Sequence, residues 1–440
     1  MTPVERFREL LRIPTVSRAD PAEVDTARFD EFHAALERLY PLTHARLERE
    51  VVAGHSLLYR WAGETADAPL VLLAHQDVVP VDGQEWRHPP FDAVIDGDGA
   101  ERAIYARGAI DDKGALVAIL EAVEEALSEG VTPRTDVWLA FGHDEETHGS
   151  GARAIAALLA ERGIRPALVL DEGGAAVEGA LPGVAAPTAM IGVAERGVAT
   201  FDLVTREAGG HASTPPRLPA TARLARAIDR LRRRPFPLRL ADPVRAMLGT
   251  AAAHATEPLR TLFRRTTMSA PLVTAAFSLL GPETNALVRT TAVVTRLEGA
   301  AGENVLATTA RASVNVRLLP GDTLSDVAIH LRRVVADPFV DIELRQGGEA
   351  SPVSPWQGEE WRRVASAVVA TLGDDVVPLP YLQLGASDSR FYTGLTANVY
   401  RFAPFHLTRS ERDALHAPDE RIRVGSWLRG IRFYRALLES

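Results

Sequence analysis

Acidic residues and histidines gather in a few short stretches of this chain, and this clustering constrains its fold and chemistry more than any other feature. The stretches contain His75 with Asp77, Asp111, Glu145 with Glu146, Asp171 with Glu172, and His416. Carboxylate and imidazole groups are oxygen and nitrogen ligands that zinc accepts in proteins. A site for two metal ions needs several such ligands and a free carboxylate that moves the protons of water. Together the stretches predict a two-metal hydrolytic site.

Three of these stretches follow apolar runs, and the runs predict how the stretches meet. Residues 68–74, 135–142 and 166–174 read as buried parallel strands that end in His75 or in acidic residues. Open α/β sheets bind ligands outside the carboxyl ends of their strands. A fourth stretch holds Asp111 in a glycine-rich turn before a helical apolar pattern. We therefore expect an α/β domain with a mostly parallel sheet and helices on both faces.

The motifs and their order resemble those of the di-zinc metallopeptidase family that includes aminoacylase, carboxypeptidase S, acetylornithine deacetylase, succinyl-diaminopimelate desuccinylase and carnosinase. The resemblance covers nearly the whole chain and is greatest to the carboxypeptidase S-like branch. It implies that His75 is the first metal ligand and that Asp77 orients its ring. It also implies that Asp111, in an Asp-x-Lys-Gly motif with Lys113, bridges the two metals.

The same resemblance implies roles for the later stretches. Glu145 corresponds to the general base, and Glu146 and His416 correspond to metal ligands. One more ligand follows the third strand, where family members use either aspartate or glutamate, and here Asp171 and Glu172 stand side by side. Adjacent strand residues point to opposite faces, so we expect only one of the two to bind. The sequence leaves open which one.

A change of pattern after the third strand predicts a second domain. The expected elements are strands over 190–205, 288–299, 307–319 and 340–346, with helices over 220–233 and 325–335. Their order, βαββαβ, is that of a ferredoxin-like split unit. We place this inserted lid and dimerisation domain at 195–350, lengthened by residues 235–266 as in the carboxypeptidase S branch. The zinc-binding catalytic domain then comprises 1–194 and 351–440.

The predicted lid has candidate residues of its own. His211 lies in a Gly-Gly-His turn that resembles the family's oxyanion-stabilising turn, which in dimeric relatives serves the partner's active site. Asn304 and Arg317 resemble substrate-binding residues of the lid, and arginine suits a carboxylate because its planar fork donates two parallel hydrogen bonds. Gly385 and Ser387, in the returning catalytic half, resemble a substrate loop near the metals. Whether His211 acts within its own subunit or across a dimer stays open.

Composition excludes some classes of partner. The chain has 440 residues, a formal net charge of -9 and no cysteine, so nucleic acid and anionic membrane surfaces are poor partners. Thiolate metal ligands and disulfides are excluded as well. No apolar run approaches the roughly 18 residues of a membrane span, and residues 1–17 read as an amphipathic helix instead of a leader. We expect a cytoplasmic protein.

The sequence thus predicts a di-zinc metallohydrolase with two Zn²⁺ per subunit, for which Co²⁺ or Mn²⁺ could substitute. We expect it to cleave the amide bond of a small peptide or N-acyl amino acid with a free carboxylate, using metal-activated water and Glu145 as base. A deacylase of another N-acylated metabolite is the alternative. A non-catalytic relative should have lost a ligand or the base, and a phosphoesterase should show a basic phosphate cradle. Neither feature is found.

Overall fold

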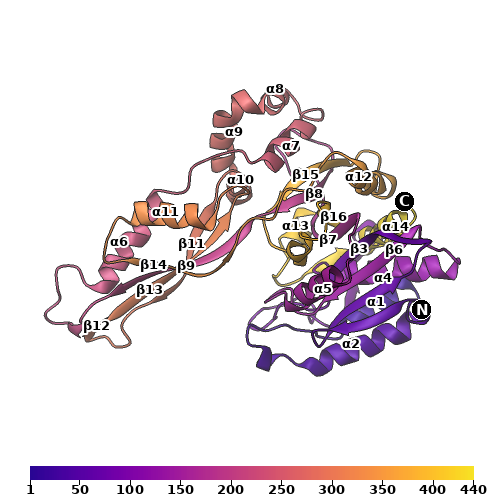
Figure 1. Cartoon of the computed structure of the whole chain (residues 1–440), viewed down its shortest axis with the longest axis horizontal. Coiled ribbons are helices and arrows are strands. Elements are labelled where there is room, and N and C mark those ends of the chain that lie inside the picture. Colours follow the sequence, from indigo (N-terminus) through magenta and orange to yellow (C-terminus); the bar gives the residue numbers. More distant parts are fainter.

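A mixed eight-stranded sheet forms the centre of the computed structural model, which describes residues 1–440 (Figure 1). Its strand order is β1-β2-β6-β3-β7-β16-β8-β15. The strands are β1 (Glu48–Val52), β2 (Ser56–Trp61), β3 (Thr65–His75), β6 (Thr135–Gly142), β7 (Leu168–Val177), β8 (Thr188–Glu195), β15 (Val377–Gln383) and β16 (Val399–Leu407). The four strands β6, β3, β7 and β16 run parallel to one another, as expected for β3, β6 and β7 from their continuous apolar runs.

Helices cover both faces of this main sheet. One face packs on α1 (Pro3–Leu11), α4 (Lys113–Ser128), α12 (Glu359–Leu372) and α14 (Val424–Leu438), and the other on α5 (Ser150–Glu161). Successive residues of β3 show the division, because Leu72 belongs to the first apolar cluster and Val71 to the second. Both faces are therefore buried, which explains why the strand lacks an alternation of polar and apolar residues.

Smaller elements complete this part of the chain. They are α2 (Thr26–Leu39), α3 (Pro41–Arg46), α13 (Arg409–Arg412), and a three-stranded sheet of β4 (Val94–Asp96), β5 (Ala103–Tyr105) and β17 (Arg421–Arg423). The three-stranded sheet joins the segment before Asp111 to the segment after His416, because β5 pairs with β17. No helix of the fold is both long and apolar enough to span a membrane.

A second sheet of four antiparallel strands projects away from the main sheet (Figure 1). We call this sheet and its two helices the small unit. Its elements are β9 (Gly197–Arg206), α6 (Ala220–Arg233), β11 (Thr291–Glu298), β13 (Thr309–Leu318), α11 (Leu324–Val335) and β14 (Asp341–Gly348). This is the predicted βαββαβ order, and the unit has an apolar cluster of its own around Phe201, Val314 and Leu331. A two-stranded ribbon of β10 (Gly210–His211) and β12 (Val305–Leu306) extends from it.

The strand predicted over 190–205 is wrong as a single element. The structure divides it into β8, a fully buried strand of the main sheet, and β9, the first strand of the small unit. The break falls at Arg196 and Gly197, where the returning chain passes so closely that a Cβ on Gly197 would lie 2.6 Å from the Ala350 nitrogen. The apolar alternation runs through this break, so the pattern alone did not reveal it.

Four helices inserted in the small unit's sequence pack on the main sheet and not on the lid to which the resemblance assigned this stretch. They are α7 (Asp242–Ala251), α8 (Leu259–Arg264), α9 (Thr266–Leu280) and α10 (Pro282–Leu287). Val244, Met247 and Leu248 of α7 belong to the apolar cluster of the main sheet and not to that of the small unit. Most buried apolar residues of 235–266, the stretch assigned to the lid by resemblance, therefore extend the core of the main sheet at its β15 edge, whereas Phe236 belongs to the core of the small unit.

Candidate metal centre

The carboxyl ends of the parallel strands bring the predicted stretches together. β3 ends at His75, β7 carries Glu172, and the loop after β6 carries Glu146. Asp111 enters from the turn before α4, and His416 enters from the turn after α13. The five side chains form two groups, His75–Asp111–Glu172 and Asp111–Glu146–His416, and within each group one possible ligand atom per residue lies within 4.8 Å of the others.

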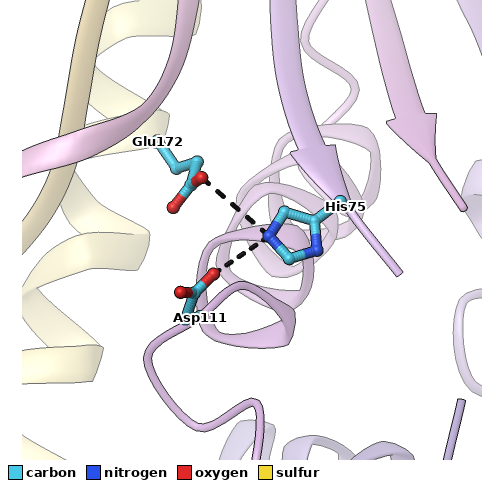
Figure 2. A group of neighbouring side chains, drawn as sticks. All are labelled: His75, Asp111 and Glu172. Atoms are coloured by element: carbon cyan, nitrogen blue, oxygen red, sulfur yellow. Dashed lines mark hydrogen bonds and ion pairs between the residues drawn. The ribbon is translucent and has the colours of Figure 1, made fainter. Parts of the chain in front are cut away.

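The first group lies around the ring of a buried histidine (Figure 2). His75 Nε2 is 3.0 Å from Asp111 Oδ1 and 3.9 Å from Glu172 Oε1. On the other side of the ring, Nδ1 is 2.9 Å from the Asp77 carbonyl oxygen and 3.3 Å from Asp77 Oδ1. An acceptor at Nδ1 selects the tautomer that leaves Nε2 free to bind a metal.

The second group shares Asp111 with the first. His416 Nε2 is 3.0 Å from Asp111 Oδ2 and 3.0 Å from Glu146 Oε1. The two oxygens of Asp111 thus face different histidines, which is the position that a bridging carboxylate requires. His416 has a φ of 59°, a left-handed conformation that is uncommon for residues with a side chain and that recurs at functional sites.

The structure separates the two acidic residues of β7. Glu172 points toward His75 and Asp111, whereas Asp171 is absent from both groups. Asp171 is buried and accepts a hydrogen bond of 2.7 Å from the Ser389 backbone N–H through Oδ2. The expectation that neighbours on a strand point to opposite faces explains this division.

Glu145 lies beside the centre without joining either group. Asp77 holds the pair in place, because its Oδ1 accepts the Glu145 N–H at 3.1 Å and its Oδ2 accepts the Glu146 N–H at 3.2 Å. Burial raises the pKa of Glu145 well above its usual range, and the nearby carboxylates of Asp388 and Glu146 raise it further against the effect of His75. A carboxyl group with a raised pKa is a stronger base once it is ionised.

The electrostatics of the two groups fit a cation. Burial and the Asp111 charge raise the pKa of Glu172 well above its usual range. Burial opposes ionisation of Asp111 too, but His416 and His75 hold the pKa of Asp111 well below its usual value. Hydrogen bonds to Asp111 and Glu146 raise the pKa of His416 to about 10. Carboxylates crowded around two histidines form the donor set that a divalent metal ion would satisfy.

A buried glutamate that the sequence did not single out supports this centre. Glu420 Oε1 accepts the N–H groups of Ile110 at 2.8 Å and Asp111 at 3.2 Å. Its Oε2 accepts Arg107 at 2.7 Å and the Gly108 N–H at 3.1 Å. Glu420 therefore fixes the turn that presents Asp111. Its position four residues after His416 was the only sign in the sequence that Glu420 belongs near the metal centre.

Two of the predicted lid residues lie far from this centre. His211 on β10 and Asn304 are both exposed, and the Asn304 carbonyl accepts the Ala212 N–H at 2.9 Å. The His211 ring bonds only within its own turn, with Nδ1 2.8 Å from Ser213 Oγ. Figure 1 shows β12, the pairing partner of β10, at the end of the small unit that is remote from the main sheet.

The other substrate candidates lie nearer to the main sheet. Arg317 is at the end of β13 that leads back toward the main sheet, opposite Val198 of β9. Burial lowers the pKa of Arg317, and the positive charge of Arg390 lowers it further. Ser387 is buried in the loop after β15, whereas Gly385 in the same loop is exposed. Arg317 and the 385–389 loop thus form a second set of candidates, distinct from those on the ribbon.

Comparison with known protein families agrees with this geometry. A family model described as peptidase family M20/M25/M40 matches residues 71–440. This chain belongs to the M20/M25/M40 peptidase family. The match includes all five residues of the two groups, and it makes the chain a metal-dependent hydrolase of the peptidase type.

Relatives of this M20 family member align along nearly all of it. The probable carboxypeptidase S-like 2 of Dictyostelium discoideum is 33% identical, over 99% of this chain and 84% of that protein. The N-fatty-acyl-amino acid synthase/hydrolase PM20D1 of Xenopus tropicalis is 31% identical, over 99% of this chain and 85% of that protein. The resemblance to the carboxypeptidase S-like branch is thereby confirmed.

Solved structures of the M20 family share the fold. An M20 family metallo-carboxypeptidase from Sulfolobus solfataricus superposes with a TM-score of 0.69 at 18% identity, covering 100% of this chain and 98% of that one. A dinuclear metal binding peptidase from Bacillus subtilis superposes with a TM-score of 0.60 at 15% identity, covering 99% of this chain and 96% of that one. At these identities the likeness establishes the α/β architecture alone.

Proposed function

We propose that the two groups bind two metal ions, with zinc as the native metal and Co²⁺ or Mn²⁺ as possible substitutes. His75 and Glu172 would hold one ion, Glu146 and His416 the other, and Asp111 would bridge them. The position of Asp111 between two histidines, at 3.0 Å from each, carries this proposal. Metal ions bound there would lower the pKa of water and polarise an amide carbonyl.

Glu145 is proposed as the general base and acid. Its half-buried carboxylate lies next to Glu146 in the chain but is free of both groups. It would take a proton from the attacking water and then pass that proton to the leaving nitrogen. Asp77 contributes by holding the backbone of Glu145 and by accepting from the ring of His75.

The substrate is proposed to be a small peptide or an N-acyl amino acid with a free carboxylate. The names of its relatives support both possibilities, because they include a carboxypeptidase S-like protein and an N-fatty-acyl-amino acid synthase/hydrolase. Arg317 and the loop of Gly385 and Ser387 would receive the carboxylate. The positive charges of Arg317 and Arg390 repel each other across this region, and an anion between them would relieve that repulsion.

His211 and Asn304 are proposed to act across a homodimer formed through the small unit, the domain we place at 195–350. Both are exposed at the remote end of the unit, so they need a second subunit or a large closure to reach a metal centre. His211 would donate to the oxyanion of the tetrahedral intermediate. A cytoplasmic location is part of this proposal.

A matched pair of substrates tests the proposed function. Zinc-loaded enzyme should hydrolyse an N-acyl amino acid or dipeptide, and kcat/KM should fall at least tenfold when the free carboxylate is converted to an amide. A charged hydrogen bond contributes about 1.5–3 kcal/mol, which corresponds to this loss or more. Arg317→Ala should produce the same loss on the acid and little further loss on the amide.

The control is Arg311→Ala, which removes another arginine from the same strand. The Arg311 guanidinium already pairs with Asp202 at 3.1 Å, so it is not expected to bind the substrate carboxylate. The Arg311→Ala variant should therefore keep the wild-type preference for the acid over the amide. Equal hydrolysis of acid and amide by the wild type would reject carboxylate recognition and favour a deacylase that recognises the acyl group. Hydrolysis of phosphoesters but not of amides would reject the reaction class.

A further inference from the structure

Two buried charged residues lie at the junction between the main sheet and the small unit. Glu195 ends β8 and Arg196 links it to β9. Their exposed fractions are only 2% and 3%, although neither belongs to the metal centre. As neighbours in an extended chain, their side chains point in opposite directions. Each therefore contacts a different part of the molecule.

The Glu195 side chain reaches the substrate loop. Its Oε2 accepts the Ser387 backbone N–H at 2.9 Å and the Ser387 hydroxyl at 3.3 Å. The guanidinium of the fully buried Arg401 lies 3.5 Å from the same oxygen. A buried carboxylate is stable only with such partners, so this network holds Ser387 in one position.

The Arg196 side chain reaches the base of the small unit. Its guanidinium donates to the Arg289 carbonyl at 3.1 Å and to the Thr291 hydroxyl at 3.1 Å, where β11 begins. It also donates to the carbonyl of Arg317 on β13. The Arg196 side chain thus joins β11 and β13 of the small unit. On β13 it contacts Arg317, the residue proposed to receive the substrate carboxylate.

Backbone groups of Glu195 and Arg196 also hydrogen-bond to the neighbouring chain segments at this junction. The Ser351 N–H donates to the Glu195 carbonyl at 3.2 Å, and the Glu195 N–H donates to Ser351 Oγ at 2.9 Å. The Arg196 N–H donates to the Gln383 carbonyl at 3.2 Å, just before the substrate loop. The outgoing and returning chains and the end of β15 are therefore joined around these two residues.

We propose that Glu195 and Arg196 are positioning residues that couple the orientation of the small unit, and with it Arg317, to the substrate loop at Ser387. The two halves of the carboxylate site lie on different sheets, so they match only if the junction holds them in register. A shift of the small unit would move Arg196 and be transmitted through Glu195 to Ser387. This inference rests on the proposed function in assigning substrate contacts to Arg317 and Ser387.

Hydrogen exchange in the zinc-loaded protein tests the coupling, because coupling between two sites is reciprocal. Arg196→Met removes contacts with the small unit only, yet it should speed amide exchange in the 384–389 loop by about fivefold or more. Glu195→Gln alters the contacts with Ser387 and Arg401 and none with the small unit, yet it should speed exchange at the start of β11 by a similar factor. Both variants should keep their metal and raise KM for the acid substrate more than they lower kcat.

The matched control is Arg289→Met, because the Arg289 side chain lies at the same junction and its buried Nε has no hydrogen-bond partner. It should leave exchange in the 384–389 loop unchanged. Should Arg196→Met fail to fold, Arg196→Lys keeps a positively charged donor group without the planar guanidinium and should show the same effect at smaller size. Exchange changes confined to the segment that each altered side chain touches would overturn the coupling. Exchange is measured without substrate, so failure of the proposed function would appear separately, in the comparison of acid and amide.

Discussion

The metal centre and the ribbon of the small unit differ in how complete they are within one chain. At the metal centre, five side chains from distant parts of the sequence meet within hydrogen-bonding distance of their neighbours or close to it. At the ribbon, His211 and Asn304 are exposed, and their hydrogen bonds stay within the ribbon and its turn. Strand ends in a parallel sheet assemble a site by folding alone, whereas a group on a projecting ribbon needs a partner or a closure. Metal binding and catalysis should therefore respond differently to changes in the two regions.

The largest effect should come from the base of the metal centre. Glu145→Gln should lower kcat by about 10²- to 10⁴-fold because proton transfer in both directions is lost. It should keep both metals, since Glu145 belongs to neither group. Glu146→Gln is the matched variant, and it should lose metal as well as activity. Equal metal loss in the two variants, measured by elemental analysis, would overturn the assignment of Glu145 as base and Glu146 as ligand.

A smaller effect is expected from the ribbon. His211→Ala should lower kcat by about 10²- to 10³-fold, the scale of one lost oxyanion donor, with unchanged metal content. His254→Ala is the control, because His254 is an exposed histidine outside both regions. Mixed dimers of His211→Ala and Glu145→Gln subunits should recover activity if the histidine serves the partner's site. Absence of recovery in a confirmed mixed dimer would place its action within one subunit or rule it out.

The smallest expected effect is on the stability of the fold, through a buried residue next to the metal centre. Lys113, the only lysine of the chain, is fully buried and donates to the carbonyls of Leu10 and Ile13 at the end of α1, at 3.3 and 2.5 Å. Lys113→Met would remove the ammonium donor from both carbonyls and leave them only backbone N–H donors, and it should lower the free energy of unfolding by about 1–3 kcal/mol. Arg46→Met, at an exposed position, should change it by less than about 0.5 kcal/mol.

The pH dependence of this stability has a definite sign. Burial lowers the pKa of Lys113 from 10.5 to about 7, so between these values the unfolded chain binds a proton that the folded chain does not. Stability conferred by this residue therefore rises with pH from about 7 to 10.5. Denaturant unfolding of the wild type and Lys113→Met across this window measures the difference. A difference that falls with pH would contradict the assigned shift.

The sequence predicted the strands of the metal centre better than the contacts that support them, for physical reasons. Apolar runs that end in ligands marked β3, β6 and β7, and the structure contains all three strands. The choice between Asp171 and Glu172 depended on the direction of one side chain at the end of an apolar run, which no periodicity specifies. Anchors such as Glu420 and Glu195 were not predicted, because they bind backbone groups that lie 310 and 192 residues away in the chain.

The break between β8 and β9 was missed for a related reason. Apolar residues continue on both sides of Arg196, but they face different cores, one under the main sheet and one in the small unit. A pattern reports that a face is buried and not which surface buries it. The same limit applies to α7, whose apolar residues pack on the main sheet.

The number of metal ions per chain tests the central claim most directly. Elemental analysis of zinc-loaded, desalted protein should give two ions per chain for the wild type and for Asp171→Asn, whose side chain can still accept the Ser389 N–H. Glu172→Gln should give fewer, because it removes a carboxylate from the group around His75. A wild type that binds no more than one ion, or an Asp171→Asn variant that loses metal while Glu172→Gln keeps both ions, would contradict the two-metal centre described here.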